Sequence, residues 1–527
     1  MAKHTDVPKP RIKLSGIKGV ILDMDGVITR TAKLHAKSWK MMFDEYLSGY
    51  QGKEADTSPL VIDIDYVNYI DGKPRYEGVK SFLESRNIEL PWGNEDDEPG
   101  KETICGLGNR KNEYFHQLLE SEGAEVFEDA KEKVSQWKSG GIKCAVVTSS
   151  KNGRKVLKTT GIEDLFHVKV DGITAKEKNL KGKPDPDIFL EAARQLNVSP
   201  EETIVFEDAL SGVQAGSDGE FGFVIGVNKK GRKKALLENG ADAVIRSFDE
   251  LEITSEGNTA AWQEMPSALK NQEEVFARFI NKEPLLFFDY DGTLTPIVDN
   301  PAEAELSFEM REIIRRLAVM AKVAVISGRD MEDVRKLVLL DNIYYAGSHG
   351  FRIWKPGGEI FENEEGKNYL PYLNQMEEAL LKEQFFASNG VEIERKRYAI
   401  AVHYRNAREK DEKYIIQKVK EIKKNHPELK AEGGKKIIEI KPDIDWHKGK
   451  AIEWLQQILQ ATEQKNETLY MGDDITDEDG FRALINRGTT ILVGWHGHPS
   501  IAAYRLRNNR EVKVFLGNLE KKLRMYG

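Results

Sequence analysis

The chain has 527 residues, of which 40% are hydrophobic, 31% are charged and 9% are aromatic. This composition is ordinary for a soluble globular protein, and the length predicts three or four domain-sized pieces. Asp and Glu outnumber Lys and Arg by 87 to 78, for a formal net charge of −9, which argues against a nucleic-acid backbone as the main partner. The two cysteines, Cys105 and Cys144, are too few for a disulfide framework or a structural zinc site.

The amino-terminal segment, residues 1–16, has no apolar core of the kind that marks a secretory signal. No segment approaches the ~18–20 uninterrupted apolar residues of a membrane helix. Together with the few cysteines and the high charge content, this predicts a cytoplasmic protein that has no membrane partner. A basic run at 229–234 contains no aromatic residue, and we interpret it as a solvated loop or face.

The first predicted element is a buried strand, because residues 20–29 read VILDMDGVIT. A short apolar run bounded by turn residues is typical of a parallel strand that is covered on both faces. Asp23 and Asp25 follow at its carboxyl end, where open α/β sheets bind ligands. Residues 31–47 and 109–121 then show helical spacing, which predicts a mainly helical insert after this strand.

Three further elements complete the first half. Residues 144–150 (CAVVTSS) predict a strand that is followed by Thr148, and residues 203–208 (TIVFED) predict a strand that ends in Glu207 and Asp208. Between them, Lys183 lies in the segment KGKPDPDIF. Hydroxyl, lysine and acidic groups are thus expected at one edge of a single sheet.

The same four elements recur in the same order in the second half, which indicates an internal duplication. Lys183 and Asp208 are 25 residues apart, and so are Lys448 and Asp473. The matching segments are LLFFDYDGTLT at 285–295, VAVISGR at 323–329, DWHKGKA around Lys448 and TLYMGDD at 468–474.

The spacings place an extra module early in the first half and late in the second half. In the second insert, residues 391–404 and 435–440 alternate like strands and residues 411–424 resemble an amphipathic helix, which predicts an α+β cap. We therefore expect two doubly wound α/β cores, each with one cap. The predicted limits are a first domain at 1–252 with a helical cap at about 32–122, a linker at 253–274, and a second domain at 275–527 with an α+β cap at about 355–441.

The repeated residue types suit phosphoryl transfer. Of two carboxylates at a strand end, the first can attack as a nucleophile and the second can move a proton. A third carboxylate allows a hard cation such as Mg²⁺ to bind, and a hydroxyl and a lysine can hold the phosphoryl oxygens. The glycine that follows each Asp-x-Asp lets the backbone approach an anion. Positioning and charge neutralisation are the main requirements of this chemistry.

Both halves resemble the haloacid-dehalogenase-like phosphatase superfamily. For the second half, the resemblance implies that Asp289 is the nucleophile that forms an aspartyl-phosphate and that Asp291 is the general acid/base. It implies a Mg²⁺ site at Asp289, Asp473 and the main-chain carbonyl of Asp291. Ser327 and Lys448 would bind the transferring phosphoryl group.

The second half is similar in particular to trehalose-6-phosphate phosphatases, through DYDGTLTPI, VISGRD, GSHGF, ERKRYAIAVHYR, IEIKPDIDWHKGKA and MGDDITDEDGF. That family uses cap residues to reach the sugar hydroxyls, because the core recognises only phosphate. The matching positions are Glu394, Lys396 and Glu439, with an exposed strand ion pair as the alternative for the first two. Arg329 is a further candidate for contact with the phosphate or the sugar. Asp474 would support the residues that bind the metal without binding the metal itself.

Two histidines of the second half are not included in the predicted site. We interpret His349 as a packed turn residue rather than as a catalyst, and we leave it out of the predicted site. His447 departs from the family pattern, in which an Asp is common before the motif lysine.

The first half resembles beta-phosphoglucomutase and its phosphatase relatives. The resemblance implies that Asp23 is the nucleophile, that Asp25 is the general acid/base, and that Asp208 completes the Mg²⁺ site with them. Thr148 and Lys183 would bind phosphate. Glu207 would support the metal-binding residues without binding the metal itself. In the cap, Thr31 and His35 match residues that gate proton transfer, Arg75 and Lys111 match cations for a distal phosphate, and Arg30 departs from the family by replacing an acid.

These observations predict a phosphatase that hydrolyses trehalose 6-phosphate with Mg²⁺ at Asp289, and a second phosphotransferase site at Asp23. The expected partners are small sugar phosphates. The alternatives are another sugar-phosphate phosphatase with the same late cap, such as one acting on sucrose 6-phosphate, or a first half that only binds a sugar phosphate and regulates the second. The sequence leaves open whether the first site is a mutase or a phosphatase, and it leaves the oligomeric state open.

Overall fold

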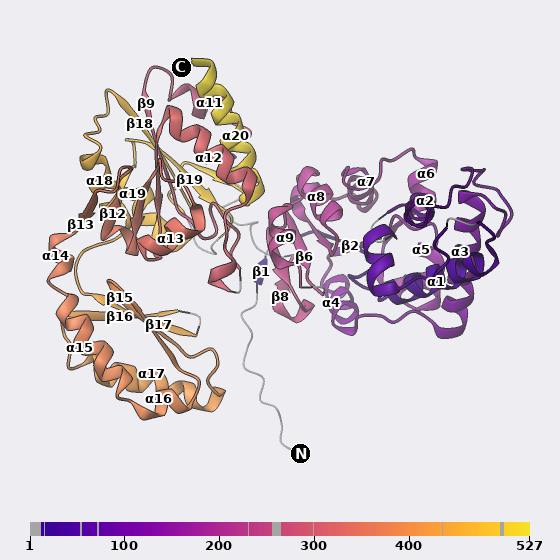
Figure 1. Cartoon of the computed structure of the whole chain (residues 1–527), viewed down its shortest axis with the longest axis horizontal. Coiled ribbons are helices and arrows are strands. Elements are labelled where there is room, and N and C mark those ends of the chain that lie inside the picture. The colour runs from indigo at the N-terminus through magenta and orange to yellow at the C-terminus, as the bar shows by residue number, and fades with distance from the viewer. Residues whose placement is uncertain are drawn as a thin grey trace. The chain divides into compact units, whose positions relative to one another are not determined.

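The computed structural model describes residues 12–14, 16–52, 55–70, 73–229, 231–255, 265–298, 300–434, 436–495 and 500–526. The chain divides into two compact units, Met1–Ala260 and Ala261–Gly527, and each is described by itself (Figure 1). Part of the predicted linker, at 256–264, lies outside the described residues. So do residues 1–11 of the amino-terminal segment and residue 230 of the basic run.

A six-stranded parallel sheet with the order β4-β3-β2-β5-β6-β7 forms the core of the first unit. All five residues of its central strand β2 are buried, as expected for a strand with helices on both faces. The strands are β2 (Gly19–Asp23), β3 (Lys143–Val147), β4 (Val168–Val170), β5 (Thr203–Glu207), β6 (Phe223–Val227) and β7 (Ala243–Ile245). The helices are α4 (Glu128–Ser139), α5 (Gly153–Thr159), α6 (Gly172–Glu177), α7 (Asp187–Leu196), α8 (Leu210–Asp218) and α9 (Lys233–Glu238).

The insert between β2 and β3 is helical in the part of it that the structure describes, as predicted. It packs around a cluster of buried aromatic and aliphatic side chains that includes Trp39, Phe43 and Phe82. The longest helix of the insert begins at Ile104 and is capped by Thr103, whose hydroxyl accepts a hydrogen bond from the Gly106 main-chain N–H at 2.9 Å. The helices are α1 (Ala32–Gly49), a π-helix at Ile62–Ile70, α2 (Arg75–Ser85) and α3 (Ile104–Glu122).

An eight-stranded sheet with the order β13-β12-β11-β10-β9-β18-β19-β20 forms the core of the second unit. It is parallel from β11 to β20, and β12 and β13 add an antiparallel edge. Its strands are β9 (Glu283–Phe288), β10 (Lys322–Ile326), β11 (Tyr344–Gly347), β12 (Arg352–Trp354), β13 (Ile360–Glu362), β18 (Asn466–Gly472), β19 (Thr489–Val493) and β20 (Tyr504–Leu506). Its helices are α11 (Gln272–Ala277), α12 (Phe308–Met320), α13 (Met331–Val338), α18 (Lys448–Ile458), α19 (Glu478–Ala483) and α20 (Asn509–Tyr526).

The cap of the second unit is a four-stranded antiparallel sheet with the order β14-β15-β17-β16, covered on one face by helices (Figure 1). Along β17, Ile438 and Ile440 join the apolar cluster under the helices, so that Glu439 and Lys441 face the other way. The α+β cap is therefore confirmed. Its elements are α14 (Glu364–Lys367), α15 (Leu370–Leu381), α16 (Gln384–Ser388), β14 (Glu392–Lys396), β15 (Ala399–His403), α17 (Glu409–Lys423), β16 (Leu429–Gly434) and β17 (Ile437–Pro442).

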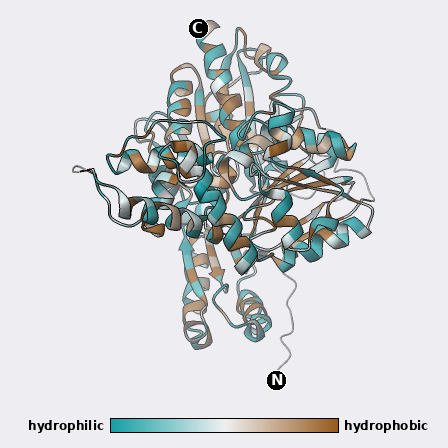
Figure 2. Cartoon of the chain, turned by 90° about the vertical axis from the view of Figure 1, so that its right-hand side faces the viewer, coloured by the Kyte–Doolittle hydropathy of each residue, from teal (hydrophilic) through white to brown (hydrophobic). Residues whose placement is uncertain are grey.

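Burial in both units follows the strands. Figure 2 shows hydrophobic residues gathered on the sheets and hydrophilic residues on the outer helix faces. A short parallel pair, β1 (Ile12–Leu14) and β8 (Leu251–Ile253), completes the first unit. None of the helices in the described ranges is both long and apolar enough to cross a membrane.

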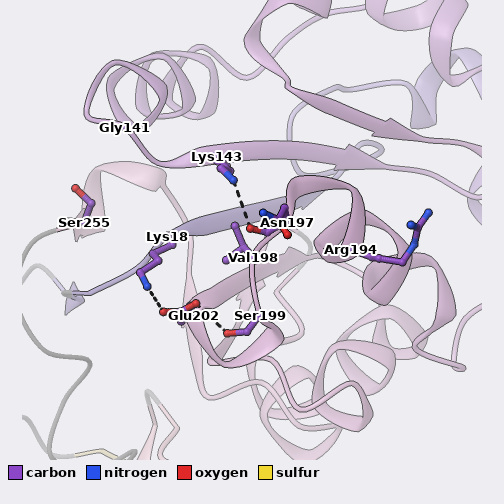
Figure 3. A pocket seen from close by; sticks show the side chains of 9 residues that line it. All are labelled: Lys18, Gly141, Lys143, Arg194, Asn197, Val198, Ser199, Glu202 and Ser255. Carbon is purple, nitrogen blue, oxygen red and sulfur yellow. Dashed lines mark hydrogen bonds and ion pairs between the residues drawn. The ribbon is translucent and has the colours of Figure 1, made fainter.

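One pocket of the first unit lies at the amino-terminal ends of β2, β3 and β5, opposite to the end that carries Asp23 (Figure 3). Its basic residues have partners within the unit. Lys18 pairs with Glu202, and the Lys143 ammonium donates to the main-chain oxygen of Leu196 at 2.8 Å. The pocket therefore has no part in the candidate site.

Candidate functional site

The predicted nucleophile of the second unit lies at the centre of the sheet edge. Asp289 follows β9, and its main-chain N–H donates to the Met471 carbonyl on β18 at 2.9 Å. On the other side, β10 pairs in parallel register with β9 and ends just before Ser327. Parallel register brings the ends of the three strands level. The predicted residues Asp289, Ser327 and Asp473 therefore follow three neighbouring strand ends at the same edge.

Lys448 joins this group from the first position of α18. Its ammonium donates to Asp289 Oδ1 and to Asp477 Oδ1, each at 2.6 Å. Burial alone would lower the pKa of Lys448, but the two carboxylates raise it above its ordinary value. The lysine is therefore a buried cation that is fixed by two anions.

Asp477 belongs to the candidate site, but the sequence prediction did not include it. It is fully buried and accepts hydrogen bonds from the Tyr470 hydroxyl and from the main-chain N–H groups of Asp473 and Asp474, at 3.1 and 3.0 Å. The predicted support residue Asp474 instead accepts from the Ile475 N–H at 2.7 Å and caps the short helix Ile475–Asp477. The signal was present in the sequence as the third acid of MGDDITDEDG.

The donor set fits a hard divalent cation. Carboxylate oxygens of Asp289, Asp473 and Asp477 lie within 4.8 Å of one another. Both oxygens of Asp477 already accept hydrogen bonds, which leaves Asp289 and Asp473 as the carboxylates that fit the cation. Burial and the neighbouring acids raise the pKa of Asp473 well above its ordinary value, and burial raises that of Asp289 to about 7. A bound cation would favour the ionised forms of both.

At position 292, which directly follows Asp291, the site has room for a glycine but not for a side chain. Gly292 has a φ of +89°, which suits glycine, and a Cβ there would overlap the Asp473 carboxylate. Its main-chain N–H donates to the Thr295 carbonyl at 2.7 Å. The glycine therefore makes room for Asp473, whereas the sequence suggested that it opens the backbone to an anion.

Tyr290 stands between the two aspartates of this segment and points into the core. It is buried beneath the site, where its hydroxyl donates to the Ala304 carbonyl at 2.6 Å. The Asp-x-Asp-Gly segment thus alternates between the site and the core, because Asp289 and Asp291 belong to the site while Tyr290 packs in the apolar cluster of the second unit.

Asp291, the predicted general acid/base, is held by Arg329. The guanidinium donates from Nε to Asp291 Oδ2 at 2.7 Å and from a terminal nitrogen to Oδ1 at 2.5 Å. This two-pronged pair is the strongest common geometry between arginine and a carboxylate. The sequence suggested Arg329 as a candidate for contact with the phosphate or the sugar, and in the structure its guanidinium pairs with Asp291.

The predicted cap residues lie on the face of the cap sheet that is opposite its helices. Glu394 pairs in register with Ala401, and Ala401 pairs with Glu439, so the two acids stand in one row across the sheet. Lys396 lies 3.4 Å from Glu439, whereas Glu394 contacts His403 at 2.9 Å. Burial would raise the pKa of Glu439, but Lys396 and other nearby cations lower it. Lys396 and Glu439 therefore form a charged pair on this face.

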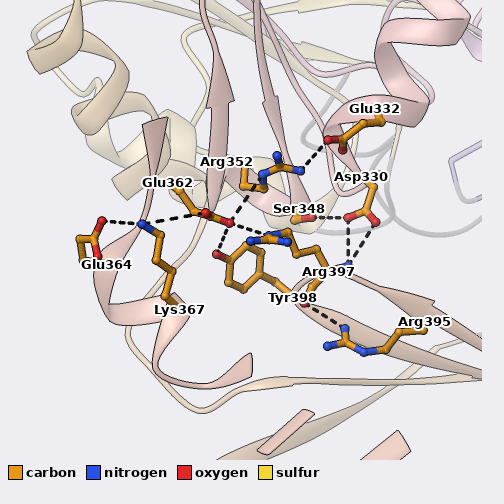
Figure 4. A network of polar contacts seen from close by, with 10 residues as sticks. All are labelled: Asp330, Glu332, Ser348, Arg352, Glu362, Glu364, Lys367, Arg395, Arg397 and Tyr398. Carbon is orange, nitrogen blue, oxygen red and sulfur yellow. Dashed lines mark hydrogen bonds and ion pairs between the residues drawn. The ribbon is translucent and has the colours of Figure 1, made fainter. Parts of the chain in front are cut away.

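The turn between β14 and β15 anchors the cap to the core (Figure 4). Glu362 accepts hydrogen bonds from Arg397 Nε at 2.5 Å and from the Tyr398 hydroxyl at 2.7 Å. The Arg397 main-chain N–H donates to Asp330 Oδ2 at 3.1 Å. The Tyr398 ring is buried and stacks on Phe351, with 4.7 Å between the ring centres. The anchor residues Arg397 and Tyr398 directly follow Lys396, so they fix that end of the face that carries Lys396 and Glu439.

The first unit repeats the arrangement of acids around a lysine. The Lys183 ammonium donates to Asp23 and to Glu207, the latter at 2.6 Å. The other oxygen of Glu207 accepts from the main-chain N–H groups of Asp208 and Ala209, at 3.0 and 2.9 Å. Oxygens of Asp23, Glu207 and Asp208 form a group that could hold a cation. As at Gly292, a Cβ on Gly26 would overlap the Asp208 carboxylate.

Of the two residues predicted to gate proton transfer in the first unit, Thr31 contacts Asp25, as does the predicted phosphate-binding Thr148, whereas His35 lies against Lys111. The Asp25 carboxylate accepts hydrogen bonds from Thr31 and from the Thr148 hydroxyl, the latter at 3.2 Å. Burial raises the pKa of Asp25, although both hydroxyls oppose this. Arg30 points elsewhere, since it pairs with Glu125 at 3.3 Å.

The predicted basic residues of this cap lie together, with Lys111 buried and His35 and Arg75 half-buried. The Lys111 ammonium lies 2.8 Å from His35 Nδ1. Burial lowers the pKa of both groups, and the Arg75 charge lowers them further. Arg75 itself donates to Asn112 at 3.0 Å. Asp25 opposes the lowering at Lys111, and a group of basic side chains that is partly shielded from water would suit an anion.

Comparisons with known proteins agree with this geometry. A trehalose-phosphatase family model matches residues 287–509, and a haloacid dehalogenase-like hydrolase model matches residues 17–219. A beta-phosphoglucomutase from Mycobacterium bovis is 44% identical over 252 residues, which are 46% of this chain and 96% of that protein. A trehalose-phosphate phosphatase from Mycobacterium bovis is 35% identical over 342 residues, which are 64% of this chain and 86% of that protein.

A longer relative matches nearly the whole chain. A Mycobacterium tuberculosis protein named "Uncharacterized glycosyl hydrolase" is 35% identical over 523 residues. The match covers 97% of this chain but only 38% of that relative's length. The predicted resemblance of both halves is confirmed, and the chain belongs to the haloacid dehalogenase-like hydrolase family, with a first half related to beta-phosphoglucomutases and a second half related to trehalose-phosphate phosphatases.

Proposed function

We propose that the second unit hydrolyses trehalose 6-phosphate to trehalose and phosphate, through an aspartyl-phosphate on Asp289. The observation that carries this proposal is the buried Asp289–Lys448 pair together with the Lys396–Glu439 pair on the cap. The first supplies a nucleophile beside a fixed cation, and the second supplies polar groups for sugar hydroxyls.

In the first step, a carboxylate oxygen of Asp289 attacks phosphorus and the bond to the sugar oxygen breaks. The electron pair goes to the sugar oxygen, which takes a proton from Asp291. In the second step, Asp291 takes a proton from water, the water oxygen attacks phosphorus, and the bond to Asp289 breaks. Ser327 and Lys448 hold the phosphoryl oxygens in both steps.

This chemistry requires that Asp291 is released from Arg329 and that the negative charge of the phosphoryl group is neutralised. Asp291 is clamped by Arg329, so we propose that a bound phosphoryl group draws the guanidinium away and frees the carboxyl group. Asp289 and Asp473 would hold Mg²⁺, which supplies positive charge to neutralise the phosphoryl oxygens.

The test is phosphate release by the full chain from trehalose 6-phosphate, with and without Mg²⁺. Asp289→Asn is expected to abolish release while the thermal unfolding transition is retained. Asp341→Asn is the matched control, because this acid is exposed and pairs only loosely with Arg335 at 3.4 Å. Retained activity in Asp289→Asn would overturn the proposed nucleophile. Faster hydrolysis of sucrose 6-phosphate would overturn the proposed substrate.

For the first unit, we propose a beta-phosphoglucomutase-like phosphotransferase on Asp23. The group of His35, Lys111 and Arg75, in which Lys111 is buried, favours a substrate with a second phosphate. Conversion of beta-glucose 1-phosphate by the full chain, followed by phosphorus NMR, tests this. Asp23→Asn should remove the conversion and leave trehalose 6-phosphate hydrolysis intact.

The alternative is a regulatory first unit that only binds a sugar phosphate. It predicts no conversion, but a change in trehalose 6-phosphate hydrolysis when beta-glucose 1-phosphate is titrated. Asp23→Asn separates the two cases, because a binding role does not require a nucleophile.

A further inference from the structure

We propose that His349 contacts the sugar ring of the substrate and helps to select it, between the phosphate-binding edge of the core and the charged face of the cap. This inference rests on the proposed sugar-phosphatase function of the second unit. It assigns a substrate contact to a residue that the sequence reasoning interpreted as turn packing.

The backbone around His349 is held in a costly conformation. Ser348, His349 and Gly350 have φ values of +51°, +56° and +91°. Non-glycine residues in this region are uncommon, and surrounding contacts must stabilise them. The His349 N–H donates to the Ser327 carbonyl at 2.9 Å, and Trp446 Nε1 donates to the His349 carbonyl at 3.2 Å. These bonds tie the turn to the segments that carry Ser327 and Lys448.

The His349 ring lies against the phosphate-binding loop. A Cβ on Gly328 would lie 2.8 Å from His349 Cε1 and 3.0 Å from Nε2. Gly328 follows Ser327 and precedes Arg329. The missing side chain at Gly328 thus gives the ring its place beside the residues that we assign to the phosphoryl group.

The ring also feels the charges of the cap. The charges that act on it come from Glu439, Lys441 and Lys396 on the cap and from Lys448 on the core. Burial lowers the pKa of His349 to about 4, and the lysines act in the same direction while Glu439 opposes them. The imidazole is therefore neutral near pH 7, with one donor and one acceptor nitrogen.

Within the part of the chain that the structure describes, neither ring nitrogen of His349 has a hydrogen-bond partner on another residue. A sugar monophosphate with its phosphoryl group at Asp289 must pass its sugar toward Lys396 and Glu439. A neutral imidazole between the two ends can exchange hydrogen bonds with a sugar hydroxyl, and it leaves the phosphoryl group to Lys448 and Ser327.

The experiment compares two substrates on the full chain: trehalose 6-phosphate, and p-nitrophenyl phosphate, which has no sugar. His349→Asn and His349→Gly both tolerate the positive φ, so the loss of the ring is separated from backbone strain. We expect about a tenfold rise in KM for trehalose 6-phosphate, as for the loss of a buried hydrogen bond. For p-nitrophenyl phosphate, kcat/KM should stay within about twofold, and His426→Asn on the cap is the matched control.

An equal loss on both substrates would overturn the proposal, because it would indicate a structural or phosphate-binding role. No change on either substrate would also overturn it. If the wild-type chain prefers another sugar phosphate, the proposed substrate is wrong, and the same comparison with that sugar phosphate decides the role of His349.

Discussion

Asp477 accepts a hydrogen bond from Lys448 at 2.6 Å at a point where both side chains are buried, and Glu207 does the same for Lys183 in the first unit. Each acid also accepts from two consecutive main-chain N–H groups at the end of the neighbouring strand. Glu207 precedes the candidate metal ligand by one residue, and Asp477 follows its counterpart by four. The two halves thus support their lysines from different sequence positions.

Asp477→Asn should weaken both stability and activity. Removing one partner of a buried ion pair typically costs about 3–5 kcal/mol, because the other charge loses its compensation. The released ammonium would also misplace the phosphoryl group, and we expect kcat to fall about 100-fold. Urea unfolding and phosphate release measure the two effects.

Asp474→Asn is the control for this prediction. Asp474 is exposed and its carboxylate caps a short helix, so its loss should cost only about 1 kcal/mol. Equal destabilisation by the two variants would show that Asp477 is not the support of Lys448.

The cap anchor predicts a selective effect on sugar substrates. Glu362→Gln removes the charge that holds Arg397 and weakens the bond to Tyr398. Since this turn fixes the position of Lys396, we expect KM for trehalose 6-phosphate to rise about tenfold. Hydrolysis of p-nitrophenyl phosphate should change by less than about twofold, because it does not need the cap.

Glu364→Gln is the matched control for Glu362→Gln. Glu364 belongs to the same network but is largely exposed and pairs only with Lys367, so its loss should have little effect. If Glu364→Gln and Glu362→Gln change KM alike, the anchor has no role in substrate binding.

The sequence predicted well which candidate residues lie at strand ends. Apolar runs followed by Asp289, Ser327 and Asp473 were sufficient, because parallel strands bring their carboxyl ends to one edge. It could not predict the partner of Lys448, because an acid can reach that lysine from several positions around the turn. The pair of Arg329 with Asp291 and the place of His349 depend on side-chain directions across separate loops, which periodicity does not encode.

A pH effect is expected from His35. Burial lowers its pKa well below the ordinary value, and Lys111 lowers it further. Below pH ~6.5 the unfolded chain binds a proton that the folded chain does not bind. The free energy of unfolding should therefore fall as the pH is lowered from ~6.5 toward the lower pKa of His35 in the folded chain. Above pH ~6.5 this contribution to stability should be fully present.

His35→Gln should reduce this pH dependence by as much as one proton. The comparison is urea unfolding of the wild-type and variant full chains at several pH values from about 5 to 8, so that contributions from other groups cancel. Parallel curves for the two proteins would contradict the prediction.

The last prediction tests whether Gly292 is needed for its positive φ or for the space that it leaves to Asp473. Gly292→Ala places a Cβ where the Asp473 carboxylate lies, so the acid must move and the cation site must change. We expect the Mg²⁺ concentration for half-maximal phosphate release to rise about 10-fold or more, as for a disturbed ligand shell. Gly358→Ala has a similar positive φ, +99° against +89°, but nothing within 4 Å of its Cβ. Both variants incur the backbone strain of about 1 kcal/mol, so only the crowding differs between them. A rise in the Mg²⁺ requirement in both variants would attribute the effect to strain, whereas a rise in Gly292→Ala alone would place Asp473 at the metal.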